Sequence, residues 1–315
     1  MAGSSLPLVS VIVPAHNAAS FVSDAIQSVY AQDYSRIEVV LIDDGSVDDT
    51  SALVQRRFPL VRVIRQKNAG VAAARNAGLR EATGDLVCFL DADDVWLPGK
   101  LSAQVQYMTT HQEVGLLFHR WHVWEPDGAG NYVLPEIAPA SNPVDVVPEA
   151  SGWLHPLLLL DCIIQTSTVM IRRETYEAVG FFDTSLASGE DYDYWLRTAH
   201  CCEQHQLAAT LSCYRVTPGS LSQKVYPVSF EYQVVLRAIE RWGLPRGGSR
   251  GIGAGAIRGR LSNLAFDHGY RQFKAGLSVS ALGGFRTAIK HDPLHMRAWA
   301  YLVVSWVNVV LSHKI

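Results

Sequence analysis

The first hundred residues alternate short apolar runs with amphipathic segments. The apolar, β-branched runs predict four strands, at 8–13, 37–42, 61–65 and 86–90. The segments between them predict helices at 17–31, 51–57 and 70–81. Strands that alternate with helices of this length predict right-handed βαβ units. We therefore expect an α/β fold with a mostly parallel, Rossmann-like sheet and helices on both faces.

Polar side chains follow each of the four predicted strands. They belong to Ala15-His16-Asn17, Asp43-Asp44, Asn68 and Asp91-Ala92-Asp93-Asp94. The carboxyl ends of parallel strands open on one edge of a sheet, where open α/β folds bind their ligands. The sequence therefore predicts a nucleotide site at this edge.

The second half of the chain is less regular. Residues 125–150 are rich in Pro, Gly, Asn and Asp and predict an irregular excursion. A strand at 167–171 and a helix at 174–179 follow, and the acidic start of 189–197 is typical of a helix N-terminus. We expect one domain over 1–236, with a first half at about 8–100 and a second half at about 101–236. A Gly- and Arg-rich linker at 237–260 and a helical appendage at 261–315 complete the predicted organisation.

The composition, 48% hydrophobic and 18% charged over 315 residues, is that of a folded globular protein. The net charge of -3 conceals an asymmetry, because residues 237–315 carry twelve Lys and Arg against three acidic residues. This basic excess predicts contact with an anionic membrane or polyanion, or else a basic helical face paired with the acidic body. We expect no nucleic-acid partner.

Cysteine usage and the amino terminus indicate the compartment. The five cysteines show neither zinc spacing nor a secreted disulfide framework. The first basic residue is Arg36, so the charged region of a signal peptide is missing. No apolar run approaches the ~20 residues that a membrane span needs. We expect a cytoplasmic protein, soluble or peripheral on the inner membrane face.

The acidic motif Asp91-Ala92-Asp93-Asp94 carries the most specific chemistry. Its carboxylates repel one another, since no Lys or Arg adjoins them, unless a cation lies between them. Oxygen ligands that leave room for phosphate oxygens suit Mg²⁺ or Mn²⁺ carrying a diphosphate. The alternative is a solvated acidic turn that caps a helix.

Five segments together resemble family 2 glycosyltransferases, which are inverting enzymes of GT-A fold. They are Val11 to Asn17, Val39 to Thr50, Asn68 to Gly78, the acidic motif, and Gly189-Glu190-Asp191. The resemblance covers about residues 8–220, in the order and spacing of the family. It implies a nucleotide-diphosphate sugar as donor, and a saccharide or lipid-linked acceptor in the synthesis of a cell-surface polysaccharide, glycan or glycolipid.

The resemblance also implies roles for individual residues. The donor nucleotide would contact Pro14, Ala15, His16, Asn17, Asp43, Asn68, Arg75, Asp91 and Ala92. Asp43 would accept from a ring N–H, which favours the uracil or thymine of a UDP- or dTDP-sugar. For Asp43 and Asp44 the alternative is a turn with a helix cap, and for Arg75 it is a surface ion pair.

Metal and acceptor chemistry are assigned in the same way. Asp93, with Asp91 as its partner, would hold Mn²⁺ or Mg²⁺, and Asp94 would be a supporting acceptor or a cap. Asp191 would take the proton of the acceptor hydroxyl. Three residues would contact the donor sugar or acceptor: Glu190, Gln165 and Arg197. Arg197 has an alternative partner in Asp193, four residues earlier on a helix.

Two other functions compete with sugar transfer. The motif Asp91-Ala92-Asp93-Asp94-Val95 also fits phosphatases of the haloacid dehalogenase type, but there it follows the first strand, whereas here three strands precede it. A catalytically inactive nucleotide-sugar-binding scaffold is the second alternative. The joint presence of Asp91, Asp93 and Asp191 argues against such a scaffold.

Overall fold

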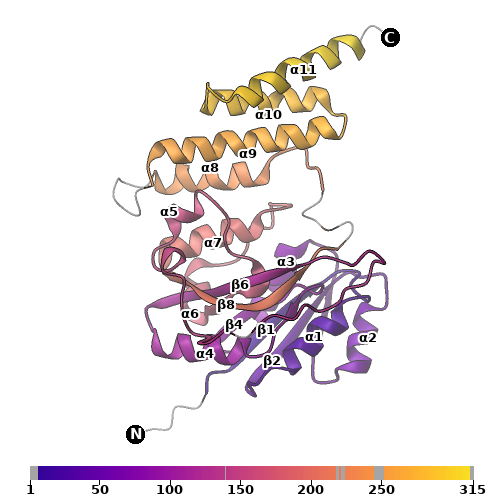
Figure 1. Cartoon of the computed structure of the whole chain (residues 1–315). Helices are drawn as coiled ribbons and strands as arrows, with labels where there is room; N and C mark the ends of the chain where they lie inside the picture. Colours follow the sequence, from indigo (N-terminus) through magenta and orange to yellow (C-terminus); the bar gives the residue numbers. More distant parts are fainter. Residues whose placement is uncertain (1–5, 139, 218–219, 221–223, 245–251, 313–315) are drawn as a thin grey trace. The chain divides into compact units, whose positions relative to one another are not determined.

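The structure is a computed structural model that describes residues 6–138, 140–217, 220, 224–244 and 252–312. The chain divides into two compact units (Figure 1). Unit 1 comprises Met1–Leu154 and Ile163–Pro218, and unit 2 comprises His155–Cys162 and Gly219–Ile315. Each unit is described by itself.

Unit 1 is an α/β unit. Its strands are β1 (Val9–Ala15), β2 (Ile37–Asp44), β3 (Arg62–Gln66), β4 (Leu86–Phe89), β5 (Val95–Trp96), β6 (Val114–Trp124), β7 (Met170–Arg172) and β8 (Glu203–Arg215). Its helices are α1 (Val22–Tyr30), α2 (Thr50–Arg57), α3 (Val71–Glu81), α4 (Lys100–Thr110), α6 (Arg173–Val179) and α7 (Glu190–Cys201). Two single turns of 3-10 helix, η1 (Pro148–Ala150) and η2 (Thr166–Thr168), complete it.

The eight strands form one sheet in the order β3-β2-β1-β4-β7-β6-β8-β5. Strands β1, β2, β3 and β4 pair in parallel, as do β6 and β8. Strand β7 is antiparallel to both of its neighbours, and β5 is antiparallel to β8. Six of the eight strands therefore run in one direction, which confirms the predicted mostly parallel sheet.

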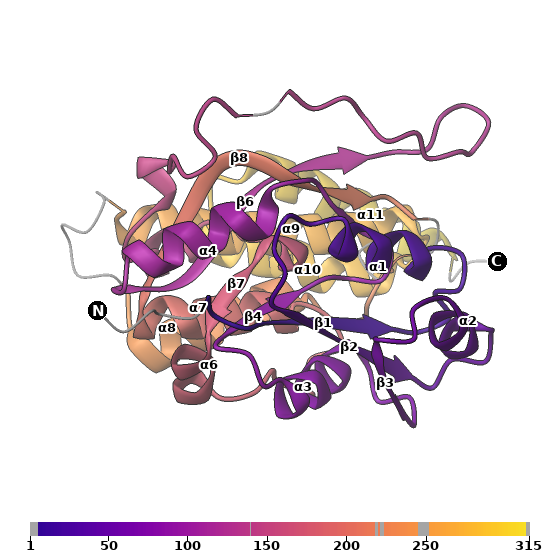
Figure 2. The same cartoon turned by 90° about the horizontal axis from the view of Figure 1, so that it is seen from below.

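Helices cover both faces of this sheet (Figure 2). On one face, Val22, Ala25 and Ile26 of α1 pack with alternate residues of β1, among them Val11 and Val13. On the other face, a Cβ added to Gly78 of α3 would lie 2.2 Å from the Ile12 side chain. Only glycine allows α3 to approach β1 this closely. Successive side chains of β1 point to opposite faces of the sheet, so the strand contributes to an apolar layer on each face.

Strand β1 is longer than predicted. We expected Pro14 to end it, but the ladder with β2 continues through Pro14 opposite Ile42 to Ala15 opposite Asp43. On the β4 side, the carbonyl of Ile12 accepts from Leu90 N–H at 3.0 Å, and Pro14 faces that side beyond the last pair. Proline therefore removes no ladder hydrogen bond, and the loop after β1 begins at His16.

The excursion predicted at 125–150 is confirmed: apart from η1 at Pro148–Ala150 and a bridge between Val146 and Leu207, its described residues form no strand or helix. Neither β6 nor β8 was predicted. Half of β6 is wholly buried, and β8 is rich in polar residues, so neither shows a clear period of two.

A buried amine lies in the core of unit 1. Lys100 at the start of α4 is fully buried; its Nζ lies 2.7 Å from Gln104 Oε1 and 3.7 Å from the centroid of the Trp96 ring. Burial lowers the pKa of Lys100 to about 8, although Cys88 beside it partly opposes the shift. The charged amine therefore destabilises the fold at neutral pH.

We expect stability to depend on pH through Lys100. Because the pKa in the folded state lies below the ordinary 10.5, the unfolded chain holds more protons between about pH 8 and 10.5, and the free energy of unfolding rises with pH there. Relative to Lys100→Met, the wild type should gain on the order of 3 kcal/mol across this window. Urea unfolding at several pH values measures the difference. Lys67→Met, at an exposed lysine, is the control and should keep the wild-type slope.

Unit 2 is helical. Its helices are α5 (His155–Leu158), α8 (Phe230–Trp242), α9 (Ala254–Lys274), α10 (Ser278–His291) and α11 (Met296–Ser312). Helices α9 and α10 approach closely, since a Cβ on Gly284 would lie 2.7 Å from Gly269 Cα. Among the described residues, no helix is both long enough and apolar enough to cross a membrane.

The predicted linker at 237–260 is wrong at both ends. Helix α8 extends to Trp242, and α9 begins at Ala254. Val234, Val235 and Ala238 give α8 a buried apolar face that continues past the expected boundary, and Ile257 gives α9 one at its start. Positions 245–251 of the expected linker and 313–315 of the expected appendage lie outside the described residues.

Candidate active site

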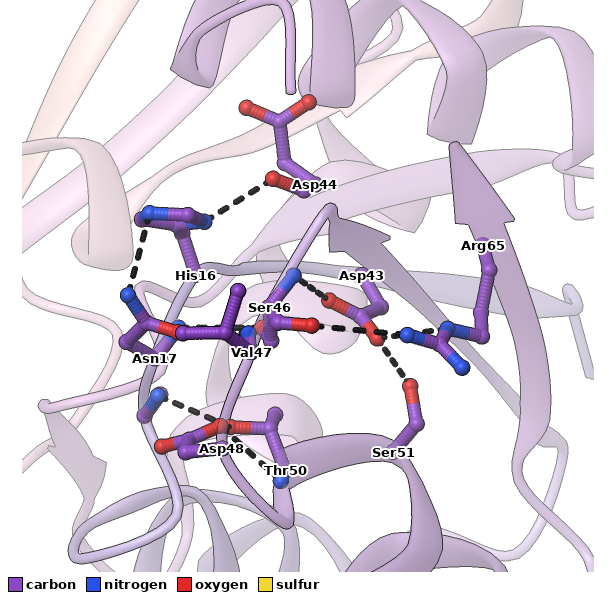
Figure 3. Close-up of polar contacts among 11 residues, drawn as sticks. His16, Asn17, Asp43, Asp44, Ser46, Val47, Asp48, Thr50, Ser51 and Arg65 are labelled. Carbon is purple, nitrogen blue, oxygen red and sulfur yellow. Dashed lines mark hydrogen bonds and ion pairs between the residues drawn. The ribbon is translucent and has the colours of Figure 1, made fainter. Parts of the chain in front are cut away.

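The loops after β1 and β2 are joined by a network of hydrogen bonds (Figure 3). Asn17, whose φ is 50°, donates from its backbone to Ser46 Oγ at 2.9 Å and accepts from Val47 N–H at 2.9 Å. His16 Nδ1 lies 2.9 Å from the carbonyl oxygen of Asp44, and His16 Nε2 lies 3.2 Å from Asn68 Nδ2. His16, Asn17 and Asn68 are exposed at the edge of the sheet. The structure thus brings together the predicted nucleotide residues of three strand ends.

Asp43 is wholly buried within this network. Its carboxylate accepts from Ser46 N–H at 2.8 Å and from the Ser51 hydroxyl, and it pairs with Arg65 at 3.1 Å (Figure 3). Burial by itself raises the pKa of Asp43, but these hydrogen bonds and the charge of Arg65 outweigh it and lower the pKa. The alternative of a turn anchor is thus present in the structure, and the bond from Asp43 to a nucleobase stays a prediction.

Asp44 fixes the start of α3. Its carboxylate accepts from the backbone N–H groups of Ala69 at 2.9 Å and Gly70 at 2.8 Å, and from Gln66 Nε2 at 2.7 Å. These N–H groups belong to the two residues that precede α3. Asp44 therefore anchors the loop that leads into α3.

Arg75 links the two acidic segments. Its Nη2 donates to Asp91 Oδ1 at 2.9 Å and its Nη1 donates to Glu190 Oε1 at 2.7 Å, across 115 residues of sequence. Only 4% of its side chain is exposed. The alternative predicted a surface ion pair, but the ion pairs of Arg75 lie in the interior. Burial disfavours the charged guanidinium, but Asp91, Glu190 and Asp191 raise its pKa overall. Burial in turn raises the pKa of Glu190, and Asp191 adds to this while Arg75 opposes it.

The acidic motif is held from two sides. Asp94 is wholly buried; it accepts from Gln165 Nε2 at 2.8 Å, the Ser167 hydroxyl at 2.6 Å and Arg215 N–H at 2.9 Å. Burial raises the pKa of Asp94 well above its ordinary value. Asp93 accepts from the Thr217 hydroxyl at 3.1 Å, and burial, aided by the charge of Asp91, raises its pKa. Ala92 between them is buried. Asp94 thus supports the motif from the core.

The turn η2 connects the motif to the second acidic segment. Asp91 N–H donates to Ser167 Oγ at 3.1 Å, and the Thr166 hydroxyl donates to Asp191 Oδ2 at 3.1 Å. Asp191 lies at the second position of α7, partly exposed, and its Oδ1 accepts from Tyr192 N–H at 2.7 Å. Gln165 Oε1 is buried and has no hydrogen-bond partner among the described residues. Adjacent residues of one short turn therefore hold the predicted metal-binding motif and the predicted base.

Arg197 does not join this group. Its Nε pairs with Asp193 at 2.8 Å, and its Nη1 and Nη2 donate to the carbonyls of Val179 and Phe181 at 3.1 and 2.8 Å. The ion pair with Asp193 was the alternative that the sequence left open, and it is present. Arg197 joins α7 to the end of α6 instead of pointing a free donor at a sugar.

Arg215, at the end of β8, was missed by the sequence. Its Nε donates to the carbonyl of Asp93 at 2.7 Å, and its Nη2 pairs with Asp24 at 3.0 Å. The rings of Phe21, Trp124 and Tyr132 surround the guanidinium, with centroids 4.9, 4.2 and 4.8 Å away. No local motif marks Arg215, because its partners lie about 120 and 190 residues away. It fixes the backbone of the acidic motif.

We expect Arg215→Lys to weaken both the site and the fold. Lysine keeps the charge but loses the planar fork and the stacking on three rings. The Mn²⁺ concentration for half-maximal nucleotide binding should rise several-fold, while the free energy of unfolding falls by about 1–3 kcal/mol. Isothermal titration and urea unfolding measure the two effects. Arg120→Lys, at an exposed arginine of β6, should change neither, and an unaltered Mn²⁺ requirement in Arg215→Lys would remove the positioning role.

The donor set fits a divalent cation that is shared with a substrate. Among the described residues, no three His, Cys, Asp or Glu side chains gather closely enough to hold a metal ion by themselves. Asp91 and Asp93 instead offer two carboxylates at the end of β4, of which the Asp91 side chain is 27% exposed. Mg²⁺ and Mn²⁺ are commonly held by one or two carboxylates, with substrate phosphate and water completing the shell.

Comparison with known proteins shows similarity to one family. Residues 10–133 match the family described as "Glycosyl transferase family 2". This part of the chain therefore has the sequence pattern of that family. It is 29% identical over 241 residues to the Bacillus subtilis protein named "Putative teichuronic acid biosynthesis glycosyltransferase TuaG", a match that covers 75% of this chain and 89% of TuaG. An uncharacterized glycosyltransferase of Nostoc is 44% identical over 115 residues, 35% of this chain and 36% of its own.

Solved structures show the same fold. S. aureus TarS in complex with UDP-GlcNAc matches 98% of this chain and 91% of its own with a TM-score of 0.65, at 19% identity. The mannosyltransferase PcManGT from Pyrobaculum calidifontis, in complex with GDP-Man and Mn²⁺, matches 97% and 87% with a TM-score of 0.56, at 18% identity. These matches confirm the predicted GT-A fold. The chain spans 33%, 58% and 36% of the length of three curated relatives.

Proposed function

We propose that this chain transfers a sugar from a nucleoside-diphosphate donor, a UDP- or dTDP-sugar, to an acceptor hydroxyl with inversion at the anomeric carbon. One observation carries the proposal: η2 holds the acidic motif through Ser167 and Asp191 through Thr166 at one edge of the sheet. The neighbouring part of the same edge, at His16, Asn17 and Asn68, offers polar groups for a nucleoside. The name of TuaG and the complexes of TarS and PcManGT with sugar nucleotides support the same class.

Each residue has a distinct task in this proposal. Asp93 and Asp91 would hold Mn²⁺ or Mg²⁺, which when bound neutralises charge on the departing diphosphate. Arg75 holds Asp91 and Glu190 in place, because both of its terminal nitrogens donate to these carboxylates. Gln165, whose Nε2 donates to Asp94, would contact the donor sugar or the acceptor. Glu190, which is nearly buried, orients the segment that carries the base.

Asp191 would act as the base. Single displacement with inversion needs a carboxylate on the face of the sugar opposite the leaving group, to take the proton of the attacking hydroxyl. Hydrogen bonds from Thr166 and from the Tyr192 backbone leave each oxygen of Asp191 with lone-pair capacity. We propose a saccharide or lipid-linked acceptor, in the synthesis of a cell-surface polysaccharide, glycan or glycolipid.

A donor screen tests the proposal. The purified full chain is incubated with Mn²⁺ and UDP-, dTDP- and GDP-sugars, and released nucleotide is measured with and without candidate saccharide acceptors. We expect slow hydrolysis of a UDP- or dTDP-sugar. The anomeric configuration of the product, measured by NMR, tests whether the reaction inverts. Binding of a nucleotide without turnover of any donor would favour the inactive scaffold. If no nucleotide binds and no donor in the panel is turned over, the proposal that the chain is a sugar transferase is refuted.

A further inference from the structure

Helix α11 presents an unusually apolar surface. From Ala298 to Ser312 its sequence contains no charged residue. Ala298 and Ser305 on its inner side are wholly buried, and Ala298 packs with Phe285 of α10 and Phe266 of α9. The α11 outer face comprises exposed residues on the remaining side, with 45–73% of each exposed: Met296, Trp299, Val303, Val304, Trp306 and Leu311. This face has no covering element among the described residues of unit 2.

The outer face is continuous. Trp299 and Trp306 are seven residues apart, two helical turns, so their indoles lie on one stripe, with Val303 between them. The two tryptophans are 46% and 56% exposed. A contiguous apolar surface of this kind marks an interaction site with a protein or a membrane. Tryptophan, which has an apolar ring and an N–H donor, is enriched at membrane–water interfaces.

Charge distinguishes the possible occupants. Three exposed basic residues lie on α10 and α11: Arg286 and Lys290 on α10, and Arg297 in the first turn of α11, where its guanidinium lies 4.8 Å from the centroid of the Phe266 ring. No acidic residue follows Asp292 in the chain. Two copies meeting through this face would bring like charges together, whereas an anionic surface would attract them. An apolar helix face with exposed tryptophans, together with basic residues on the same helices, is typical of interfacial binding.

We propose that the α11 outer face binds the surface of an anionic lipid bilayer. Trp299, Val303 and Trp306 enter the interfacial region, and Arg286, Lys290 and Arg297 contact the headgroups. Because the inner side of α11 is buried against its own unit, the helix lies along the surface on one side only. The proposal does not depend on the chemistry at Asp93 or Asp191.

Vesicle cosedimentation of the full chain tests the proposal. We compare phosphatidylcholine vesicles with vesicles that contain phosphatidylcholine and phosphatidylglycerol in equal parts. The wild type should bind the anionic vesicles and lose binding as salt is raised. Trp299→Ser with Trp306→Ser should lower the partition coefficient roughly tenfold or more, and Arg286→Gln with Lys290→Gln and Arg297→Gln several-fold. The matched control is Trp153→Ser, at a tryptophan of unit 1 that is 54% exposed, and it should bind like the wild type.

Further measurements separate the other outcomes. Circular dichroism and nucleotide titration establish that each variant is folded, since the substituted residues are exposed and remote from the nucleotide network in sequence. Light scattering on a sizing column reports the oligomeric state. A wild-type dimer that the tryptophan pair dissociates, together with unchanged vesicle binding, would overturn the proposal in favour of a second copy. Equal binding to neutral and anionic vesicles would refute the role of the basic residues.

Discussion

Asp191→Asn should lower the transfer rate by roughly 10³-fold or more while leaving nucleotide affinity within about twofold of the wild type. Asparagine has almost the same shape and can still accept from the Thr166 hydroxyl or the Tyr192 N–H, so the start of α7 should stay in place. It cannot take a proton from an acceptor hydroxyl. The loss should therefore fall on kcat, because proton transfer occurs only as the bond to the sugar forms.

The measurement pairs steady-state transfer with titration of UDP in the presence of Mn²⁺. Asp193→Asn is the matched control: it makes the same chemical change two residues later on the same helix, at a carboxylate that pairs with Arg197. We expect that variant to keep most of its activity. If Asp191→Asn reduces UDP affinity as much as it reduces turnover, Asp191 belongs to the donor-binding groups and another residue is the base.

The second large effect is expected from Asp93→Ala, which should abolish the dependence of nucleotide binding on metal. In the wild type we expect Mn²⁺ to raise UDP affinity at least tenfold, because the cation screens the diphosphate from the carboxylates. Removal of the Asp93 carboxylate leaves Asp91, which already accepts from Arg75, as the remaining carboxylate of the pair. Metal-linked affinity should then vanish, and donor turnover should fall with it.

Calorimetric titration of UDP, with Mn²⁺ and with a chelator, measures this linkage directly. Asp49→Asn serves as control, since its carboxylate is 62% exposed and pairs only with Arg56 among the ion pairs described. Thermal unfolding without metal shows whether loss of the hydrogen bond from Thr217 has weakened the fold. An Asp93→Ala protein that binds UDP more tightly with Mn²⁺, to the same degree as the wild type, would remove Asp93 from the metal site.

The sequence by itself determined the alternation of strands and helices in the first hundred residues and the polar groups at four strand ends. Period-2 and period-3.6 patterns are local, and the preferences of a parallel sheet follow from them. The edge where His16, Asn68 and Asp91 lie was therefore predictable from the sequence, whereas the strand order β3-β2-β1-β4 came from the structure. The acidic motif could be predicted for the same reason, because its residues are consecutive and directly follow an apolar run.

Only the tertiary structure decided what holds these groups in place. Arg75 bridges Asp91 and Glu190, and Arg215 fixes Asp93 from the end of β8, a strand that no period marked. Such ion pairs and hydrogen bonds form in the closely packed interior, where the dielectric constant is low. Their partners are far apart in the chain, so no local sequence pattern marks them. The bounds of the predicted linker were wrong for a similar reason. The Gly- and Arg-rich composition indicated a linker, but the apolar faces of α8 and α9 extend their helices into it.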